Sequence, residues 1–112
     1  VPLARDVLSD VIPPLGYRPS IERIQEVVAA HAGLTVAKLT SASREQKVAL
    51  PRQIAMYLCR ILAEEKLQAI AEKFNKKDHT TVISAIDRVK SLLETDEHVR
   101  TAVSALTSKL AP

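Results

Sequence analysis

A run of six polar residues at positions 76–81 has the side-chain types best suited to contact a ligand. The run is Lys-Lys-Asp-His-Thr-Thr, and an apolar pattern of helical spacing begins directly after it. A carboxylate can accept a hydrogen bond from cytosine N4, an imidazole can donate to guanine or to a phosphate, and a threonine methyl group suits the thymine methyl. Lys76 and Lys77 can offset the charge of nearby phosphates. We therefore expect base contacts from Asp78, His79, Thr80 and Thr81.

Two predicted helices joined by a tight turn position these residues. The apolar spacing predicts a short helix over 67–74, a turn at 75–77 and a longer helix that Asp78 caps. This is the helix-turn-helix plan, in which the first helix braces the DNA backbone and the second places its N-terminal turn in the major groove. Asp78 is expected to cap the helix whether or not it also contacts a base. Other helical hairpins share this spacing, so the pattern alone is not specific to DNA binding.

Capping residues predict the elements upstream. Ser20 is a suitable N-cap for a helix over 21–31, and Gly33 can close that helix in a left-handed conformation. Thr35 then caps a short helical turn through residue 39. The chain before residue 20 predicts a separate helix over 3–12, followed by a proline-rich linker.

The middle of the chain is predicted as a loop followed by a long helix. Residues 40–50 have no clear period and are expected to form an ordered loop that carries Arg44 and Lys47. Pro51 is expected to be the first residue of a helix that ends near residue 65, because the missing N–H costs nothing there. Arg52 then lies at a helix start, where backbone N–H groups favour a phosphate. The residues expected to face inward are Ile54, Leu58, Ile61 and Leu62.

The remaining pattern completes an all-α fold. Apolar residues at 82, 86, 89 and 93 repeat at helical spacing, and Thr95 or Asp96 is expected to start a last helix. Its apolar face is Val99, Val103, Leu106 and Leu110. We therefore predict one compact helical domain with a helix-turn-helix, preceded by a connector helix.

Composition excludes several other classes of protein. The 112 residues suffice for one domain, and only 3% are aromatic, which argues against a many-stranded β fold and against binding of single strands by stacking. The single cysteine, Cys59, cannot form an internal disulfide or a cysteine zinc cluster, and we expect it to lie against the core. The three histidines are far apart in sequence, so no metal site is expected, and no nucleophile stands beside a base. With no long apolar run, we expect a soluble, cytoplasmic protein.

The net charge of +3 is unevenly distributed along the chain. Residues 38–90 carry eleven basic and six acidic side chains, whereas the two flanks together carry five basic and seven acidic ones. This segregation favours a polyanion-facing middle, although a solvated charged surface is the commoner cause of such a pattern.

Three separated motifs resemble the DnaA family of bacterial replication initiators. The run over 67–74, Leu-Gln-Ala-Ile-Ala-Glu-Lys-Phe, followed by Asp-His-Thr-Thr-Val at 78–82, resembles the family signature. Residues 51–58 are similar to the helix upstream of it, and residues 21–28 are similar to the opening helix of the family's C-terminal DNA-binding domain. The resemblance covers about residues 20–110, with the motifs in family order, and it implies a helix-turn-helix of the Trp-repressor type.

The resemblance implies sequence-specific binding of duplex DNA, by a monomer, at the DnaA boxes of a replication origin. Asp78, His79, Thr80 and Thr81 match the family residues of the major groove, and Arg44 matches the arginine that enters the adjacent minor groove. The expected contacts to the DNA backbone or the groove edge are Lys47, Arg52, Gln53, Arg60, Leu67, Gln68, Lys76 and Lys77.

The resemblance also implies that the chain is part of a larger initiator. Residues 1–19 are similar to the end of an ATPase lid and a connector helix, and residues 20–112 to the DNA-binding domain. The chain has no G-x-x-x-x-G-K-[ST] phosphate loop, so ATP and Mg²⁺ are expected only for the missing ATPase module and no hydrolysis is expected here. The expected partners are origin DNA, the rest of the initiator chain and neighbouring protomers.

Two departures from the family pattern affect these expectations. The loop around Arg44 is usually more basic than Ala-Ser-Arg-Glu-Gln, so its contribution to affinity is expected to be reduced. The turn at 75–77 commonly contains glycine, whereas here it is Asn-Lys-Lys, and asparagine tolerates the left-handed conformation.

Two other interpretations remain open. A helical protein-interaction module could use the same basic surface to dock an acidic partner. The first twelve residues could contact acidic lipids, but Arg5 stands against Asp6 and Asp10, which does not favour that contact.

Overall fold

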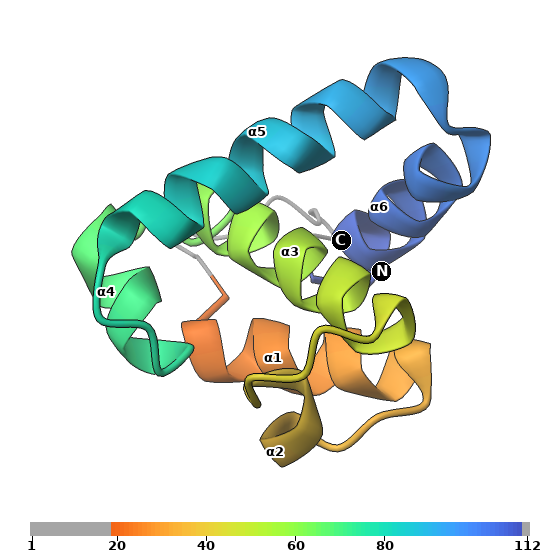
Figure 1. Ribbon diagram of the computed structural model, residues 1–112. Coiled ribbons are helices and arrows are strands. Elements are labelled where there is room, and N and C mark those ends of the chain that lie inside the picture. Colours follow the sequence, from red (N-terminus) through yellow and green to blue (C-terminus); the bar gives the residue numbers. More distant parts are fainter. Residues whose placement is uncertain (1–18, 111–112) are drawn as a thin grey trace, which may run out of the picture.

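The computed structural model describes residues 19–110, and this part of the chain forms six helices and no strand. In chain order they are α1 (Ile21–Ala32), α2 (Val36–Leu39), α3 (Gln46–Ile61), α4 (Leu67–Lys73), α5 (His79–Thr95) and α6 (Glu97–Leu110). The helix α3 lies between α1 and α5 (Figure 1), and its contacts with these two are the most extensive among the described helices. The all-α class is confirmed. The connector helix predicted over 3–12 lies outside the described residues.

Local caps set the ends of the first two helices, as predicted. Ser20 Oγ accepts a hydrogen bond from Arg23 N–H at 3.0 Å. Thr35 Oγ1 accepts one from Lys38 N–H at 3.1 Å, and α2 ends at Leu39 as expected. At the end of α1, Gly33 has a φ of 73°, a left-handed conformation that glycine adopts without strain.

The helix α3 begins earlier than predicted, and Pro51 lies inside it rather than at its start. Its first turn contains Val48, which is fully buried, so packing against the core draws residues 46–50 into the helix. Pro51 has no N–H to donate to the carbonyl of Lys47, and this loss falls within the first two turns of the helix. The predicted loop over 40–50 is therefore shorter: Arg44 lies in it, whereas Lys47 lies on α3.

The same helix also ends earlier than predicted. It stops at Ile61 rather than near residue 65, and Glu64 adopts a positive φ of 53°, which does not continue a helix. Ile61 was predicted to face inward but is 43% exposed. It lines a surface groove with Leu67 and Ile83, because the chain turns away before another element covers it.

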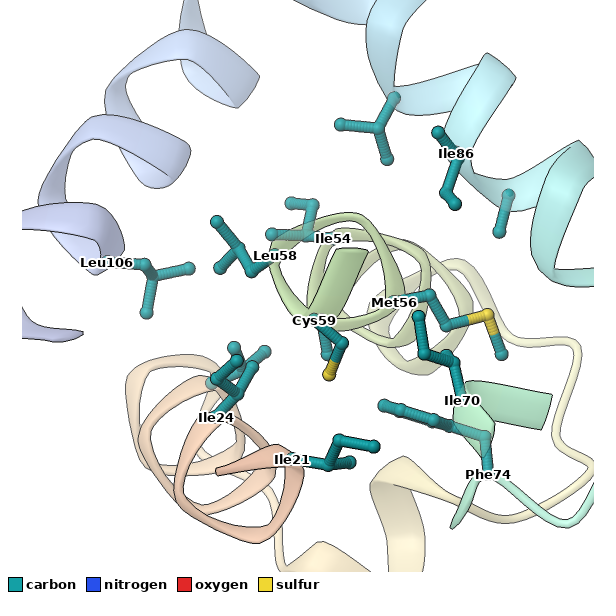
Figure 2. Packing of buried hydrophobic residues seen from close by; sticks show 14 of the residues in the cluster. Ile21, Ile24, Ile54, Met56, Leu58, Cys59, Ile70, Phe74, Ile86 and Leu106 are labelled. Atoms are coloured by element: carbon teal, nitrogen blue, oxygen red, sulfur yellow. The ribbon is translucent and has the colours of Figure 1, made fainter. Parts of the chain in front are cut away.

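The hydrophobic core surrounds α3, which Figure 2 shows nearly end-on. Met56 points toward Ile70 of α4, and Leu58 points toward Leu106 of α6 (Figure 2). Cys59 is fully buried in the core, as predicted, and this burial raises the pKa of its thiol, which keeps the group protonated and unreactive. The fully buried side chains of α3 are Val48, Ala55, Met56, Leu58 and Cys59.

The last two helices pack through the apolar faces that the sequence predicts. Val82, Ile86 and Val89 of α5 are buried. Of the two predicted starting points for the last helix, Asp96 provides the cap: its Oδ1 accepts a hydrogen bond from His98 N–H at 2.9 Å. The buried residues of α6 are Val99, Val103, Leu106 and Leu110. None of the helices within residues 19–110 is long and apolar enough to cross a membrane.

The different burial of Leu58 and Ile61, both on α3, leads to a stability prediction. Leu58→Ala opens a cavity in the core and should lower the free energy of unfolding by about 2–5 kcal/mol. Ile61→Ala removes a side chain that is 43% exposed and should cost about 1 kcal/mol or less. Urea denaturation followed by circular dichroism measures both values. Equal losses for the two variants would contradict the placement of Ile61 at the surface.

Candidate nucleic-acid interface

The elements α4 and α5 form the predicted helix-turn-helix. Phe74 ends α4 and is fully buried, and Asn75 follows with a φ of 60°. In the turn, Asn75 N–H donates to the carbonyl of Glu72 at 3.1 Å, and Lys76 N–H donates to that of Ala71 at 2.8 Å. These bonds satisfy the last carbonyls of α4 and reverse the chain direction. The left-handed asparagine predicted for this turn is confirmed.

The four predicted base-contacting residues lie together on the exposed start of α5. Asp78 Oδ1 accepts hydrogen bonds from both Thr80 N–H and Thr80 Oγ1–H, each at 2.9 Å. His79 Nδ1 lies 3.6 Å from the same carboxylate oxygen. The predicted N-cap is confirmed, and the two hydrogen bonds from Thr80 hold the pKa of the Asp78 carboxyl below its usual value. Asp78 and Thr80 therefore form one ordered unit at the helix start.

Arg52 lies in a different setting from the one the sequence predicts. It lies within α3 rather than at its start. The prediction that Arg52 stands at a helix N-terminus, where backbone N–H groups would favour a phosphate, is therefore wrong. Its side chain is buried, with only 9% exposed, and burial lowers the pKa of the guanidinium. Nη1 donates to the carbonyl of Ser41 and Nη2 to that of Ser43, both at 2.9 Å. Arg52 thus connects α3 to the loop that carries Arg44.

A groove between α3 and α5 gathers several of the predicted backbone-contacting residues. Arg52, Gln53 and Lys76 line it together with Thr81, and burial together with the charge of Arg52 lowers the pKa of Lys76. Arg88 of α5 also lines the groove, although the sequence analysis did not single it out. Its position seven residues, or two helical turns, after Thr81 is a signal that could have identified it.

A second groove contains two more of the predicted residues. Arg60 and Leu67 line it with Ile61, Ile83 and Lys90. Arg60 Nη1 also donates to a backbone carbonyl, that of residue 65, at 2.9 Å, which holds the connection between α3 and α4. Three further candidates, Lys47, Gln68 and Lys77, are exposed outside both grooves.

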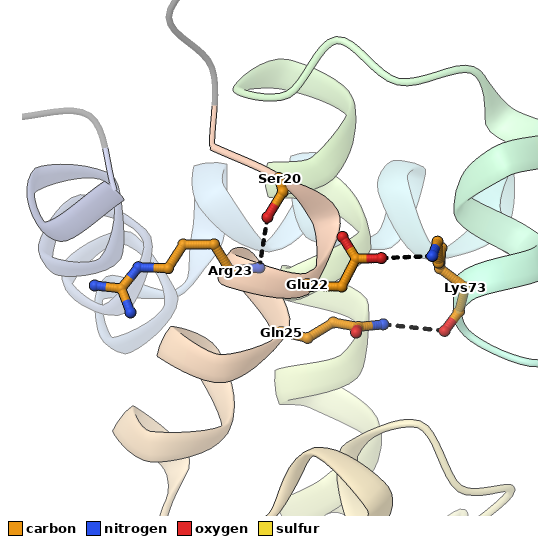
Figure 3. Close-up of polar contacts among 5 residues, drawn as sticks. All are labelled: Ser20, Glu22, Arg23, Gln25 and Lys73. Atoms are coloured by element: carbon orange, nitrogen blue, oxygen red, sulfur yellow. Dashed lines mark hydrogen bonds and ion pairs between the residues drawn. The ribbon is translucent and has the colours of Figure 1, made fainter.

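Polar contacts from α1 hold the end of α4 in place (Figure 3). Gln25 is buried, and its Nε2 donates to the carbonyl of Lys73 at 3.0 Å. Glu22 forms an ion pair with the ammonium group of Lys73, and this hydrogen-bonded contact lowers the pKa of Glu22 and raises that of Lys73. The first helix of the helix-turn-helix is therefore fastened to the body of the domain. A glutamine within an apolar stripe gave no sequence signal of this role.

The two histidines outside the recognition turn lie near each other. His31 of α1 and His98 of α6 are exposed and line one surface groove, together with Glu97. Across residues 19–110, no three His, Cys, Asp or Glu side chains form a group suited to hold a metal ion.

Comparison with known proteins matches most of the chain to one family. Residues 21–89 match the family described as "Bacterial dnaA protein helix-turn-helix". The chromosomal replication initiator proteins DnaA of Geobacter sulfurreducens and Geobacter metallireducens are 40% and 39% identical to the chain over 104 residues, which is 93% of the chain. The chain spans about a quarter of the length of these curated relatives, 23% in each case.

Two solved structures are similar in fold and sequence. A crystal structure of a DNA replication initiation factor has a TM-score of 0.70 and 33% identity, with 81% of this chain and 29% of that chain covered. A replication initiator DnaA bound to AMPPCP and single-stranded DNA has a TM-score of 0.68 and 35% identity, with 80% and 27% covered. In both comparisons the shared fold extends over about four fifths of this chain.

The hydrogen bonds at Asp78 predict a measurable titration. The fold stabilises the Asp78 carboxylate, so its pKa is lower in the folded than in the unfolded protein. Its contribution to the free energy of unfolding is therefore complete above the pKa of the unfolded state and is lost as the pH falls through the pKa of the folded state. Thr80→Ala removes one of the two donors and should raise the pKa of Asp78 toward its ordinary value of 3.8. Thr81→Ala, the control, should leave this pKa unchanged. NMR titration of the Asp78 carboxyl carbon measures the shift, and an equal pKa in all three proteins would contradict the assigned bonds.

Proposed function

The chain belongs to the DnaA family of bacterial replication initiators and carries the family's DNA-binding helix-turn-helix, and on that basis we propose that it binds the DnaA box of a replication origin as duplex DNA. One observation carries the proposal. Asp78, His79, Thr80 and Thr81 are all exposed on the first turn of α5, while the adjacent Val82 is fully buried and anchors that turn to the core. A rigid helix that presents short polar side chains at its N-terminus suits base contacts in the major groove.

The hydrogen bonds at this turn assign different chemistry to each side chain. Asp78 uses Oδ1 for the cap, so Oδ2 is the oxygen that accepts a hydrogen bond from cytosine N4. The Thr80 hydroxyl donates to Asp78, which leaves its methyl group for a thymine methyl. His79 donates to a guanine or to a phosphate. Thr81 lines the groove beside α3 and contacts the base or sugar edge there.

Cationic side chains and one glutamine around this turn contact phosphates in the proposed complex. Lys76 and Lys77 flank the start of α5, while Gln53 and Arg88 line the groove between α3 and α5. Arg60 lines the second groove and contacts a phosphate there. The remaining proposed backbone contacts are Lys47, Leu67 and Gln68. Such contacts position the protein without reporting the base sequence.

Arg44 is the proposed minor-groove residue. Its side chain is exposed on the short loop between α2 and α3, and that loop is connected to α3 by Arg52. A guanidinium is attracted to the concentrated negative potential of a narrow A·T-rich minor groove. In this arrangement α5 and the loop occupy adjacent grooves of one duplex.

The function of the chain within a whole initiator is part of the proposal. Since it spans about a quarter of its curated relatives, we assign it the task of positioning the initiator at the origin. ATP and Mg²⁺ binding belong to an ATPase module outside this chain, and the chain itself is no enzyme. Residues 1–19 join it to that module, and neighbouring protomers assemble on adjacent boxes in the bacterial cytoplasm, at the nucleoid.

Fluorescence anisotropy with labelled DNA tests the proposal. The chain is titrated with a box duplex, a scrambled duplex and a single strand of the box sequence, at two salt concentrations. The box duplex should bind about 10³-fold more tightly than the scrambled one, and both affinities should fall as salt rises. Equal affinity for the two duplexes, together with binding of an acidic protein, would favour the protein-docking alternative. Preference for the single strand would contradict the duplex assignment.

His79 provides a test of base contact. His79→Ala should weaken binding to the box by about 1–3 kcal/mol and leave the scrambled duplex nearly unaffected, because only a specific contact is lost. His98→Ala is the matched control: His98 is also exposed on the first turn of a helix and lies near an aspartate cap, but it belongs to α6. Anisotropy titrations measure both. If His79→Ala weakens both duplexes equally, His79 does not distinguish bases.

Arg44 provides a test of the minor-groove contact. Arg44→Ala should relax the preference for A·T pairs at one end of the box and shorten the protected footprint there. Arg23→Ala, which removes an exposed arginine on α1, should leave the footprint unchanged. Hydroxyl-radical footprinting on duplexes with A·T or G·C pairs at that end measures the effect. A footprint of full length with Arg44→Ala would exclude the minor-groove role.

A further inference from the structure

We propose that Arg52 is a positioning residue: it holds the loop that carries Arg44 at a set distance from the recognition turn, so that both can enter adjacent grooves of one duplex. This proposal rests on the proposed function. It differs from a phosphate contact because its effect is exerted on the loop of the free protein, through carbonyl groups, before DNA is bound.

The hydrogen bonds of Arg52 carry the proposal. One guanidinium binds two carbonyl groups of the same segment, those of Ser41 and Ser43, each at 2.9 Å. The group is planar and its donors are fixed in a fork, so binding both carbonyls restrains the position and the orientation of the segment. A side chain that is only 9% exposed is itself held in one place by its surroundings. The loop therefore takes its position from α3.

The loop has few other restraints. Residues 40–45 contribute no side chain to the buried hydrophobic cluster. The start of the loop is bonded to α2, because Ser41 Oγ–H and Ser41 N–H donate to the carbonyl of Lys38 at 2.6 and 3.1 Å. Two bonds of 3.3 Å follow, one from Ser43 N–H to Ser41 Oγ and one from Glu45 N–H to Ser43 Oγ. The two bonds within residues 41–45 shape the loop internally and do not join it to α3 or α5. Without Arg52, the loop and its exposed Arg44 would sample a wider range of positions.

A second contact joins the same segment to the recognition turn. Asn75 Nδ2 lies 3.5 Å from the carbonyl of Thr40, to which it donates a long hydrogen bond. Lys76, the next residue of the turn, lines the same groove as Arg52. The carbonyls of residues 40, 41 and 43 are thus held from α3 and from the turn before α5. Arg44 and the first turn of α5 are connected through this short polar path.

A fixed spacing between the two DNA-contacting parts has an energetic consequence. If the loop is already placed when α5 enters the major groove, Arg44 reaches the minor groove without a further loss of conformational freedom. If the loop is free, that loss reduces the affinity gained from Arg44. The loss of affinity is therefore expected for box DNA, where the protein contacts both grooves, and not for random duplex.

The variant Arg52→Lys separates positioning of the loop from a charge contact to phosphate. Lysine keeps the positive charge for a phosphate but cannot bind both carbonyls in the fork geometry. We expect Arg52→Lys to weaken box binding by about tenfold, with unchanged binding to random duplex and an unchanged salt slope. The double variant Arg52→Lys, Arg44→Ala should bind the box no more weakly than Arg44→Ala alone, because both changes remove the same contact. Arg23→Lys on α1 is the matched control and should change nothing.

A measurement without DNA distinguishes failure of this proposal from failure of the proposed function. The heteronuclear ¹⁵N NOE of the Arg44 and Glu45 amides should fall in Arg52→Lys, while the values across α4 and α5 stay unchanged. An unchanged NOE would overturn the proposal even if box binding is confirmed. Equal loss of affinity on both duplexes, additive with Arg44→Ala, would also overturn it, because Arg52 would then act on DNA independently of the loop. Unchanged box affinity in Arg52→Lys would overturn it as well, because the positive charge alone would then be sufficient.

A second variant covers the case in which Arg52→Lys does not fold. Asn75→Gly keeps a residue that tolerates positive φ and removes only the side-chain bond to the Thr40 carbonyl. It should lower the same NOE values and weaken box binding by a few-fold, non-additively with Arg44→Ala. If Asn75→Gly leaves both the NOE and the box affinity unchanged, the connection between the turn and the loop plays no part in DNA binding, and the proposal fails.

Discussion

The helix α3 must bury side chains on several sides at once, and this requirement arranges the other helices. It packs against α1 on one side and α5 on another, and it also contacts α2 and α4. Ala55, Leu58 and Cys59 are fully buried within one turn of it. A helix enclosed in this way cannot shift without opening cavities, and each cavity of leucine size costs about 2–5 kcal/mol. The helix-turn-helix therefore takes its position from α3.

Hydrophobic packing has no preferred direction, so polar contacts decide where the exposed parts of the interface lie. Gln25 holds the last carbonyl of α4 against α1, and Arg52 holds the loop against α3. Asp78 orders the first turn of α5 through Thr80. These contacts are made within the protein itself, so the surface proposed to meet DNA is organised in advance. Preorganisation reduces the conformational freedom that is lost on binding.

Most of the fold follows from local patterns in the sequence. The caps Ser20, Thr35 and Asp78 were predictable because each accepts a hydrogen bond from a residue only two or three positions away. The limits of α3 were not predictable in this way. Pro51 lies inside the helix because the buried Val48 draws the preceding turn into the core, and Ile61 is exposed although its spacing matches the inward face. Both outcomes depend on what neighbouring helices cover, which spacing along one helix does not specify.

The residues of the candidate site also fall into two groups, those predictable from local sequence and those whose contacts depend on the fold. The sequence by itself determined the recognition turn, because Asp78 and its neighbours are consecutive and their chemistry depends only on exposure at a helix start. Only the tertiary structure decided what Arg52 does, since it bonds carbonyls nine and eleven residues away, and that Gln25 supports α4 across 48 residues. Contacts of this kind are set by the packing of α1, α3 and α4 against each other. The type of a side chain determines which bonds it can form, and the fold determines which partners lie within its reach.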